Sequence, residues 1–471
     1  MPAPFRFRLV AAVCAVGLLA AACGGGEESE DSETATDTGE SPTEMTVEES
    51  PSPAETSPME TSEPMTPESP TDASPDGGSD GGDGTLDLGY LLPETGDLAS
   101  IGNGLIQGVQ FARSQINEAG GVLGNDVPEI SGSDEAGDEA IANESADRLL
   151  SEDVDAIMGA AASGMSLAVI DRITGAETLQ CSGSNTSPTF TGYEDNGGYY
   201  IRTAPSDALQ GPVLAETVAG DGNASVAVVA RADDYGTALA DATQNALEEA
   251  GAEVPVNTTY DTQATNFDSV VSEVASAEPD AVVLVSFPED GSAILQTMIE
   301  QGLGPQAVDL YGTDGLQDES LPDQVAQDQP GVLSGMKGTA PAGAGGSEDF
   351  VSSLQEFAPD LENTIFSAQF YDCVIVTALA AEAAGSDAPS AMVDEVNAVT
   401  REGTECTSFE ECKSLLSEGE NIDYQGASGP LEFTDDGEPS AATIESWRFT
   451  EEGSIETLDT TDVQLDSSES S

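Results

Sequence analysis

Residues 224–251 read ASVAVVARADDYGTALADATQNALEEAG, and this stretch shows which class of fold the chain adopts. Its first eight residues are a short apolar run that predicts a strand over 224–231. Apolar side chains then recur at helical spacing, which predicts a helix over 236–250. A strand followed by a helix in this way is typical of βαβ units with parallel sheets.

The same alternation of apolar runs and amphipathic segments continues on both sides of this stretch. It therefore predicts an α/β fold, and because the roughly 370 residues from 86 to 455 exceed what one core usually supports, we expect two α/β lobes. Strands are expected at 85–92, 156–160, 178–182, 281–286 and 308–312, and helices at 101–119, 137–150, 207–219, 268–277 and 291–302.

The chain of 471 residues is strongly acidic, with 89 Asp and Glu against 11 Lys and Arg, a formal net charge of −78 and no histidine. Without histidine there is no Ser-His-Asp or Cys-His nucleophile, no imidazole metal ligand and no ordinary general base near pH 7. The negative charge repels phosphate groups, so nucleic acids and anionic membrane surfaces are poor partners. An enzyme is therefore disfavoured.

The N-terminus has the layout of a secretion signal. Arg6 and Arg8 precede an apolar run too short to span a membrane, and three alanines then lead to Cys23. A cysteine directly after small residues resembles the bacterial lipoprotein signal, although Ala20 stands where that pattern usually has Leu. The resemblance implies a signal peptide over 1–22 and a lipid anchor on Cys23; ordinary secretion with a spare cysteine is the alternative.

Two further segments have the composition of disordered chain. Residues 23–85 are dominated by Ser, Thr, Pro, Gly, Asp and Glu, and residues 456–471 are acidic and rich in Ser. Such segments cannot bury enough apolar surface to offset their ordering entropy. We expect the first to be a disordered acidic tether between the anchor and the folded part, and the second to be a disordered tail.

Once the signal is removed and Cys23 carries lipid, four cysteines remain: Cys181, Cys373, Cys406 and Cys412. An even number in an exported protein suggests disulfides, with three possible pairings. Their closeness in sequence favours a bond between Cys406 and Cys412, which would leave Cys181 to close a far longer loop with Cys373. Without histidine, these four thiols make a poor zinc site.

Several segments, in order, resemble the type I periplasmic binding proteins for branched-chain amino acids. The resemblance covers roughly residues 86–452. The segments are LLPETGDLASIGNGLIQGVQFARSQINEAGGVLG (91–124), SGSNTSPTFT (182–191), YYIRTAPSDALQG (199–211), DDYGTALA (233–240), FAPDLENTIFSAQFYDCVIVTALAAEAA (357–384) and GASGPLEFTDDGEPSA (426–441).

This resemblance implies two Rossmann-like lobes that close over one small ligand for an ABC importer. It implies no cofactor, no metal and no enzymatic activity, and it implies a monomer that docks on permease subunits outside the cytoplasm. The crossovers between the lobes are expected near 205–207, 338–340 and 433–436. Lobe I would then comprise 86–206 and 339–433, and lobe II would comprise 207–338 and 434–455.

By the same resemblance, Ser163, the Ser184 backbone and the Thr186 hydroxyl would bind the ligand carboxylate. The residues themselves agree, because 159–164 follow a predicted strand and open a helix whose first N–H groups can bind an anion. The alternative is that Ser163 only caps this helix.

Asp207 and Asp314 match family positions that face the ligand ammonium. Asp207 could instead cap the helix over 208–219, and Asp314, flanked by glycines, could be a plain turn residue. Two carboxylates in one pocket are costly unless a cation neutralises them, so the pair favours a zwitterionic or cationic ligand over a simple carboxylate.

Three further residues would wall the pocket by resemblance: Tyr235 over the ligand, and Ile101 and Phe287 beside its side chain. Each could equally be a core residue. An apolar wall suggests an aliphatic side chain without fixing which one. A ligand sensor for a membrane receptor, or an importer component for amides, urea or aromatic acids, are the alternative functions.

The charge leads to a first prediction. A net charge of −78 opposes the compact state by self-repulsion, and at roughly 1 M salt the Debye length falls to about 3 Å, which screens most of this repulsion. We therefore expect a halophilic protein that melts at a higher temperature in 2 M than in 0.1 M NaCl. Melting curves of residues 86–471 test this, and an equal or lower melting temperature at high salt would contradict it.

Overall fold

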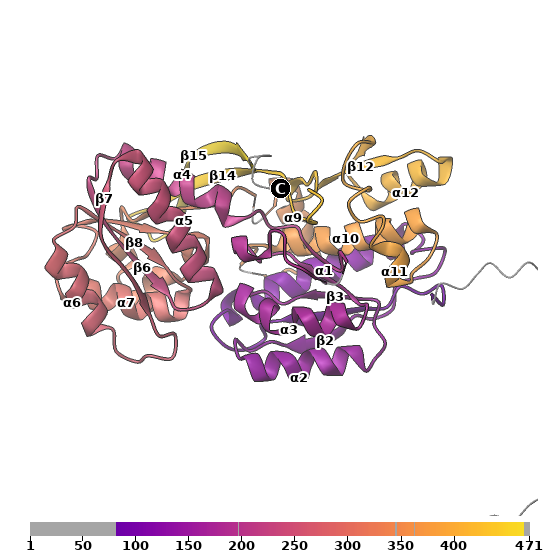
Figure 1. Cartoon of the computed structure of the whole chain (residues 1–471), viewed down its shortest axis with the longest axis horizontal. Helices are drawn as coiled ribbons and strands as arrows, with labels where there is room; N and C mark the ends of the chain where they lie inside the picture. The colour runs from indigo at the N-terminus through magenta and orange to yellow at the C-terminus, as the bar shows by residue number, and fades with distance from the viewer. Residues whose placement is uncertain (1–81, 196, 344–345, 362, 466–471) are drawn as a thin grey trace, which may run out of the picture. The chain divides into compact units, whose positions relative to one another are not determined.

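A computed structural model describes residues 82–465 apart from 196, 344–345 and 362 (Figure 1). All of these residues belong to one compact unit. The predicted signal peptide, the predicted lipidation site Cys23, residues 23–81 of the predicted tether and residues 466–471 lie outside the described residues. Within the described part of the chain, no helix combines the length and the apolar character needed to cross a membrane.

The first sheet has five parallel strands in the order β2-β1-β3-β4-β5. Helices α1 and α10 cover one face of this sheet, and α2 and α3 cover the other (Figure 1). Side chains of its strands cluster with those of the helices on each face. Its elements are β1 (Leu88–Leu92), α1 (Ala99–Glu118), β2 (Ser131–Asp134), α2 (Glu139–Leu150), β3 (Ala156–Gly159), α3 (Ser163–Gly175), β4 (Leu179–Ser182), η1 (Pro188–Phe190) and β5 (Tyr200–Arg202).

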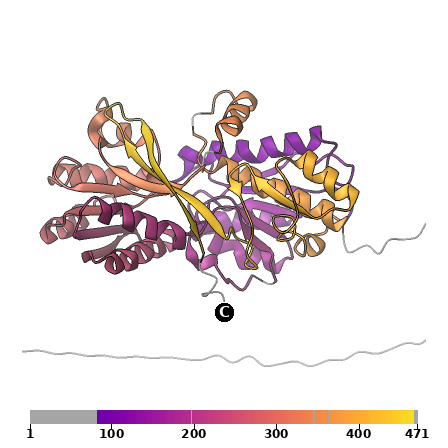
Figure 2. The ribbon, with the colours of Figure 1, turned by 90° about the horizontal axis from the view of Figure 1, so that it is seen from above.

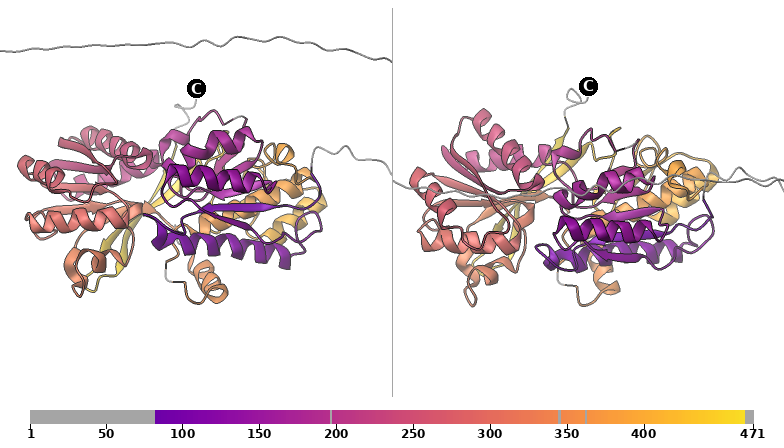
Figure 3. Two further views of the ribbon diagram at one scale, coloured as in Figure 1. Left: turned by 90° about the horizontal axis from the view of Figure 1, so that it is seen from below. Right: turned by 60° about the horizontal axis from the view of Figure 1, so that its bottom comes forward.

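The second sheet has seven strands in the order β15-β14-β10-β9-β8-β6-β7, and its parallel part runs from β10 to β7. The two sheets occupy separate regions of the unit (Figure 3). The elements are α4 (Asp207–Gly220), β6 (Ser225–Arg231), α5 (Asp234–Ala250), β7 (Glu253–Tyr260), α6 (Asp268–Ala277), β8 (Ala281–Val285), α7 (Pro288–Glu300), β9 (Asp309–Gly312), η2 (Asp314–Leu316), α8 (Leu321–Val325), η3 (Pro330–Leu333), β10 (Lys337–Pro341), β14 (Ala441–Phe449) and β15 (Ile455–Gln464).

The apolar run of β6 explains why this strand lies inside the second sheet. Val226 and Val228 belong to the same cluster as side chains of α4 and α5, whereas Ala227 and Val229 cluster with side chains of α6 and α7. Both faces of the strand are therefore buried, as is usual for parallel sheets with helices on each side. The predicted α/β class with parallel sheets is confirmed.

Between β10 and β14 the chain returns to the first sheet and builds the layer that contains α10. This helix is buried along most of its length against α1, and it ends at Gly385 in the left-handed conformation with a φ of 64°. The remaining elements are α9 (Glu348–Phe357), α10 (Ser367–Ala384), α11 (Pro389–Met392), β11 (Thr404–Cys406), α12 (Phe409–Glu418), β12 (Ile422–Gly426) and β13 (Gly429–Pro430).

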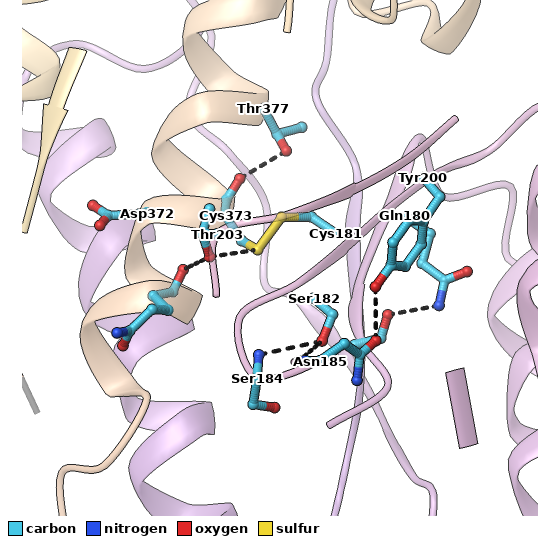
Figure 4. Close-up of a disulfide and its surroundings, with 12 residues drawn as sticks. Gln180, Cys181, Ser182, Ser184, Asn185, Tyr200, Thr203, Asp372, Cys373 and Thr377 are labelled. Carbon is cyan, nitrogen blue, oxygen red and sulfur yellow. Dashed lines mark hydrogen bonds between the residues drawn. A yellow bond between two sulfur atoms is a disulfide. The ribbon is translucent and has the colours of Figure 1, made fainter. Parts of the chain in front are cut away.

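Both favoured disulfides are confirmed. Cys181 of β4 is bonded to Cys373 of α10, with a Cα–Cα distance of 5.7 Å, and both residues are fully buried (Figure 4). Cys406 and Cys412 join β11 to α12, with a Cα–Cα distance of 5.4 Å. The first bond ties the layer that follows β10 to the inner strand β4 of the first sheet, across 192 positions of sequence.

The chain passes between the regions of the two sheets three times, from β5 to α4, from β10 to α9 and from β13 to β14. The crossing predicted near 338–340 is wrong in position, because these residues lie inside β10 and pair with β9 and β14. The chain leaves the second sheet only after Pro341. The residue ranges of the two lobes otherwise remain predictions.

The prediction of a disordered tail from residue 456 is wrong for its first part. Residues Ile455–Gln464 form β15, which pairs antiparallel with β14 in a long ribbon (yellow in Figure 2). The segment contains Thr and Val among its acids, and backbone pairing with β14 is enough to order it although most of its side chains are exposed. Its acidic side chains are typical of an edge strand that avoids further pairing.

Candidate functional site

A small cavity lies at the carboxyl ends of strands from both sheets. In α/β folds this is where ligands bind. Six of the eight predicted ligand residues line it, namely Ser163, Ser184, Tyr235, Asp314, Ile101 and Phe287; the other lining residues are Leu98, Ala161, Ala162, Pro288, Gly315, Gln317, Asp318, Ile365 and Phe366.

Ser163 is the first residue of α3, and its side chain does not cap the helix. Ala162 occupies the N-cap position, and the nearest partner of the Ser163 hydroxyl is the backbone N–H of Ser187, at 3.5 Å. The capping alternative for Ser163 is therefore wrong. Because the first N–H groups of a helix have no acceptor within the helix, this end of α3 can bind an anion at the cavity.

The loop before α3 is held by hydrogen bonds from β4 and the residues after it. Ser182 Oγ donates to the Ala160 carbonyl at 2.8 Å, and Ser184 Oγ donates to the Ala161 carbonyl at 2.9 Å. Asn185 Nδ2 donates to the same Ala161 carbonyl at 2.8 Å. The cavity wall formed by this loop is therefore fixed before any ligand arrives.

Glu135 also holds this loop, although the sequence did not distinguish it from the other acidic residues. It is fully buried, and its two carboxyl oxygens accept the backbone N–H groups of Ala161 at 2.6 Å and Ala162 at 3.2 Å. Burial raises the pKa of Glu135 to about 8, against the lowering effect of these two hydrogen bonds. Two backbone donors of the loop are thus occupied by the protein itself, which leaves those at the start of α3 for a ligand.

Asp207 does not line the cavity and lies fully buried at the first position of α4. The helix is capped by Ser206, whose hydroxyl accepts the Ala208 N–H at 3.3 Å, so the capping alternative for Asp207 is wrong. Among the described residues, neither carboxyl oxygen of Asp207 has a hydrogen-bond partner. The Thr186 hydroxyl is near enough to lower the pKa of Asp207, but it too is buried without a hydrogen bond in the described part of the chain.

Asp314 begins η2 and is bonded from both sides. Its Oδ1 accepts hydrogen bonds from the Tyr235 hydroxyl and from Gln210 Nε2, each at 2.9 Å. The Tyr235 hydroxyl also lies 2.8 Å from Thr313 Oγ1. Asp314 is therefore more than a turn residue, because its carboxyl group organises the cavity wall around Tyr235.

The two aspartates raise each other's energy in the ionised state. Burial raises the pKa of Asp207 well above its usual range, and the charge of Asp314 raises it further. Burial also raises the pKa of Asp314, while the hydrogen bonds from Tyr235 and Gln210 lower it. A cation placed between the two groups would remove this penalty and favour both ionised forms.

Apolar side chains form the remainder of the cavity. The rings of Tyr235 and Phe287 are stacked, with their centroids 5.2 Å apart and their planes at 10°. Leu98, Ile101 and Phe366 contribute further apolar surface. Tyr235, Ile101 and Phe287 are thus both buried core residues and parts of the cavity wall, so the two readings of these residues do not exclude each other.

An ion pair beside the cavity joins elements of the two sheets. Arg231, at the end of β6, bonds Asp97, just before α1, with an Nη2–Oδ2 distance of 3.1 Å. Arg231 also pairs with Asp233 and Asp290, and its guanidinium lies 3.8 Å from the centroid of the Phe287 ring. The arrangement fixes Phe287 and holds the two sides of the cavity together.

The sequence matches one protein family and resembles individual proteins of known role. The family described as periplasmic binding protein matches residues 85–441. The chemotactic signal transduction system substrate-binding protein BasB of Halobacterium salinarum is 25% identical over 357 residues, which is 74% of this chain and 83% of that protein.

Solved structures show the same fold at low sequence identity. The branched-chain amino acid transporter substrate-binding protein LivJ of Streptococcus pneumoniae, in complex with isoleucine, has a TM-score of 0.65 at 21% identity and covers 81% of this chain and 100% of that one. A solute-binding protein of an ABC transporter from R. palustris, in complex with 4-hydroxybenzoate, has a TM-score of 0.66 at 18% identity and covers 82% and 99%.

The Glu135 geometry leads to a second prediction, for Glu135→Gln. Because the pKa of Glu135 is raised in the folded state, the stability that its neutral form gives is complete below about pH 4.5 and is lost as the pH rises through about 8. Gln cannot ionise, so the free energy of unfolding of the variant does not fall in this way. Between pH 4.5 and 8.5 it should rise relative to that of the wild type by on the order of 4 kcal/mol. Denaturant unfolding at several pH values measures this, and parallel stability curves for the two proteins would contradict it.

Proposed function

Because this chain belongs to the periplasmic binding protein family, a family of binding proteins and not of enzymes, we propose that it is the solute-binding component of an ABC importer whose ligand is a zwitterionic α-amino acid. The observation that carries the proposal is the Asp207 carboxyl group, which is fully buried and accepts no hydrogen bond of ordinary geometry among the described residues. Burial and the charge of Asp314 raise its pKa well above the usual range, against the lowering effects of the Thr186 hydroxyl and the charge of Arg202. Such a group is expensive to ionise without a partner. An ammonium group of the ligand would be that partner, shared with Asp314.

The opposite side of the cavity suits the ligand carboxylate. The N-terminus of α3 provides backbone N–H groups and the Ser163 hydroxyl, and Ser184 lies beside them. Thr186 is buried next to Asp207, and its hydroxyl has no hydrogen-bond partner among the described residues. This hydroxyl can bind either end of the ligand. A ligand with separated positive and negative groups therefore fits both sides at once.

Closing of the two lobes on the ligand would be the signal to the permease. Residues of both sheets line the cavity, so a ligand bound there favours the closed arrangement over an open one. The ion pair between Arg231 and Asp97 supports the same arrangement. We further propose that the protein works outside the cytoplasm as a monomer, held to the membrane by a lipid on Cys23.

A second function has one observation in its favour, namely the similarity to BasB, whose name assigns that protein to chemotactic signal transduction. A sensor would bind the same ligand and deliver it to a membrane receptor. The two functions are separated by reconstitution, because an importer component stimulates ATP hydrolysis by its permease when ligand is present and a pure sensor does not. Aromatic acids, as in the R. palustris complex, fit less well, because they bring no cation to the two aspartates.

Asp207→Ala gives the third prediction. Removal of this carboxylate leaves the ligand ammonium without one of its two acceptors, so the affinity should fall by about 2–5 kcal/mol. Isothermal titration in 2 M NaCl with a panel of amino acids, amides, urea and aromatic acids measures the effect. Asp207→Asn is the variant with the smaller change in shape, and Asp241→Asn, at an exposed position of α5, is the control for loss of one negative charge. A loss below about 0.5 kcal/mol would mean that Asp207 does not contact the ligand.

The raised pKa values of Asp207 and Asp314 give the fourth prediction. A bound ammonium favours their ionised forms, so binding should release protons, and affinity should rise with pH while the pair titrates in the free protein. Titration in buffers of different ionisation enthalpy counts the protons released. Proton uptake, or an affinity that falls as the pH rises, would contradict the proposed ammonium site.

A further inference from the structure

The cavity contains a third carboxylate that the amino-acid ligand of the previous section does not use. Asp318 follows η2 on the same loop as Asp314, lines the cavity and is only 6% exposed. Its Oδ1 accepts the backbone N–H of Ser320 at 2.8 Å. Its Oδ2 is buried and has no hydrogen-bond partner among the described residues.

The turn around Asp318 does not explain this second oxygen. Oδ1 alone satisfies the Ser320 N–H, and the backbone carbonyl of Asp318 accepts the N–H of Leu321 at 3.0 Å at the start of α8. A residue needed only for this turn would not require a second buried acceptor, and an unpaired carboxylate oxygen in the interior is costly.

Protein cations near the cavity are already engaged. None of the described residues that line the cavity is Lys or Arg. Arg231, beside Phe287, directs its donors to Asp97, Asp233 and Asp290. The amide of Gln317, the neighbour of Asp318, donates to Glu445 Oε1 at 2.6 Å.

The apolar wall defines what kind of ligand can reach Asp318. Leu98, Ile101, Phe287 and Ile365 line the same cavity and offer surface to methylene groups, but no hydrogen-bond donors. A side chain with an apolar stem and a polar end satisfies both the wall and the carboxylate, as long cationic side chains do elsewhere. A purely aliphatic side chain would cover Oδ2 of Asp318 without giving it a donor.

We propose that the ligand is an α-amino acid whose side chain ends in an N–H donor, and that Asp318 accepts this donor through Oδ2. The proposal rests on the proposed function, because it places the α-ammonium between Asp207 and Asp314. It differs from a branched-chain ligand in making Asp318 the residue that selects the side chain. Terminal ammonium, guanidinium and amide groups share the required chemistry.

The test compares side chains that differ only at their end. Lysine and norleucine have the same four-carbon chain, and only lysine carries a terminal ammonium; glutamine and arginine represent the amide and guanidinium groups, and leucine represents the branched aliphatic class. We expect the full-length wild-type chain, titrated in 2 M NaCl, to bind at least one of the donor-bearing ligands about tenfold or more tightly than norleucine or leucine.

Variants of Asp318 assign the preference to this residue. Asp318→Asn keeps an oxygen for the Ser320 N–H, and it should reduce the affinity for lysine about tenfold or more while leaving that for norleucine unchanged. Asp318→Leu should reverse the order of the two ligands. Asp323→Asn, at an exposed position of α8, is the matched control and should bind like the wild type.

The outcomes separate this inference from the proposed function. If norleucine or leucine binds wild type as tightly as the donor-bearing ligands, the role of Asp318 is overturned and the amino-acid site stands. If only amides, urea or aromatic acids without an α-ammonium bind, both are overturned. If the Asp318 variants show no cooperative melting, the wild-type ratio of lysine or glutamine to norleucine decides, with a ratio near one against the inference.

Discussion

The Asp207 carboxyl group is costly to ionise inside the protein, because burial and the charge of Asp314 raise its pKa more than the Thr186 hydroxyl and the charge of Arg202 lower it. The fold creates this situation, because the carboxyl ends of the strands in both parallel regions meet at one cavity, and the chain crosses from β5 into α4 beside it. Asp207 is the first residue after that crossing, and Asp314 follows β9 from the other sheet. The positions of the two charges are thus consequences of topology, and in the proposed function a bound ammonium group would offset their cost.

A second buried network, around Arg202, keeps this geometry in place and offsets only part of the cost of ionising Asp207. Arg202, at the end of β5, forms a buried ion pair with Glu438, in the stretch that leads to β14. Its Nη1 also donates to the carbonyls of Asn185 at 3.1 Å and Ser187 at 2.8 Å. These contacts join the loop that carries Thr186 to two of the three crossings.

The sequence predicted the fold class, because strands such as β6 are apolar on both faces. The family was predicted from several segments that resemble known members in the same order. Sequence alone left the caps open: Ser206 and not Asp207 caps α4, a choice that depends on side-chain geometry. Glu135 and Asp318 could not be singled out, since each is one of 89 acidic residues and only its burial distinguishes it. The strand β15 was missed because its backbone pairing with β14 overrides a composition typical of disorder.

The few basic residues of the described chain are almost all engaged by acids of the protein. Within the described part of the chain, eight of the nine Lys and Arg residues form ion pairs with acids, and the ninth, Arg113, donates to the backbone carbonyls of Val127 and Pro128. Dissolved salt can screen the exposed acids, but it screens buried pairs much less. In the proposed function, a cationic group of the ligand would neutralise the buried pair Asp207 and Asp314, and its recognition would be linked to the stability of the closed form.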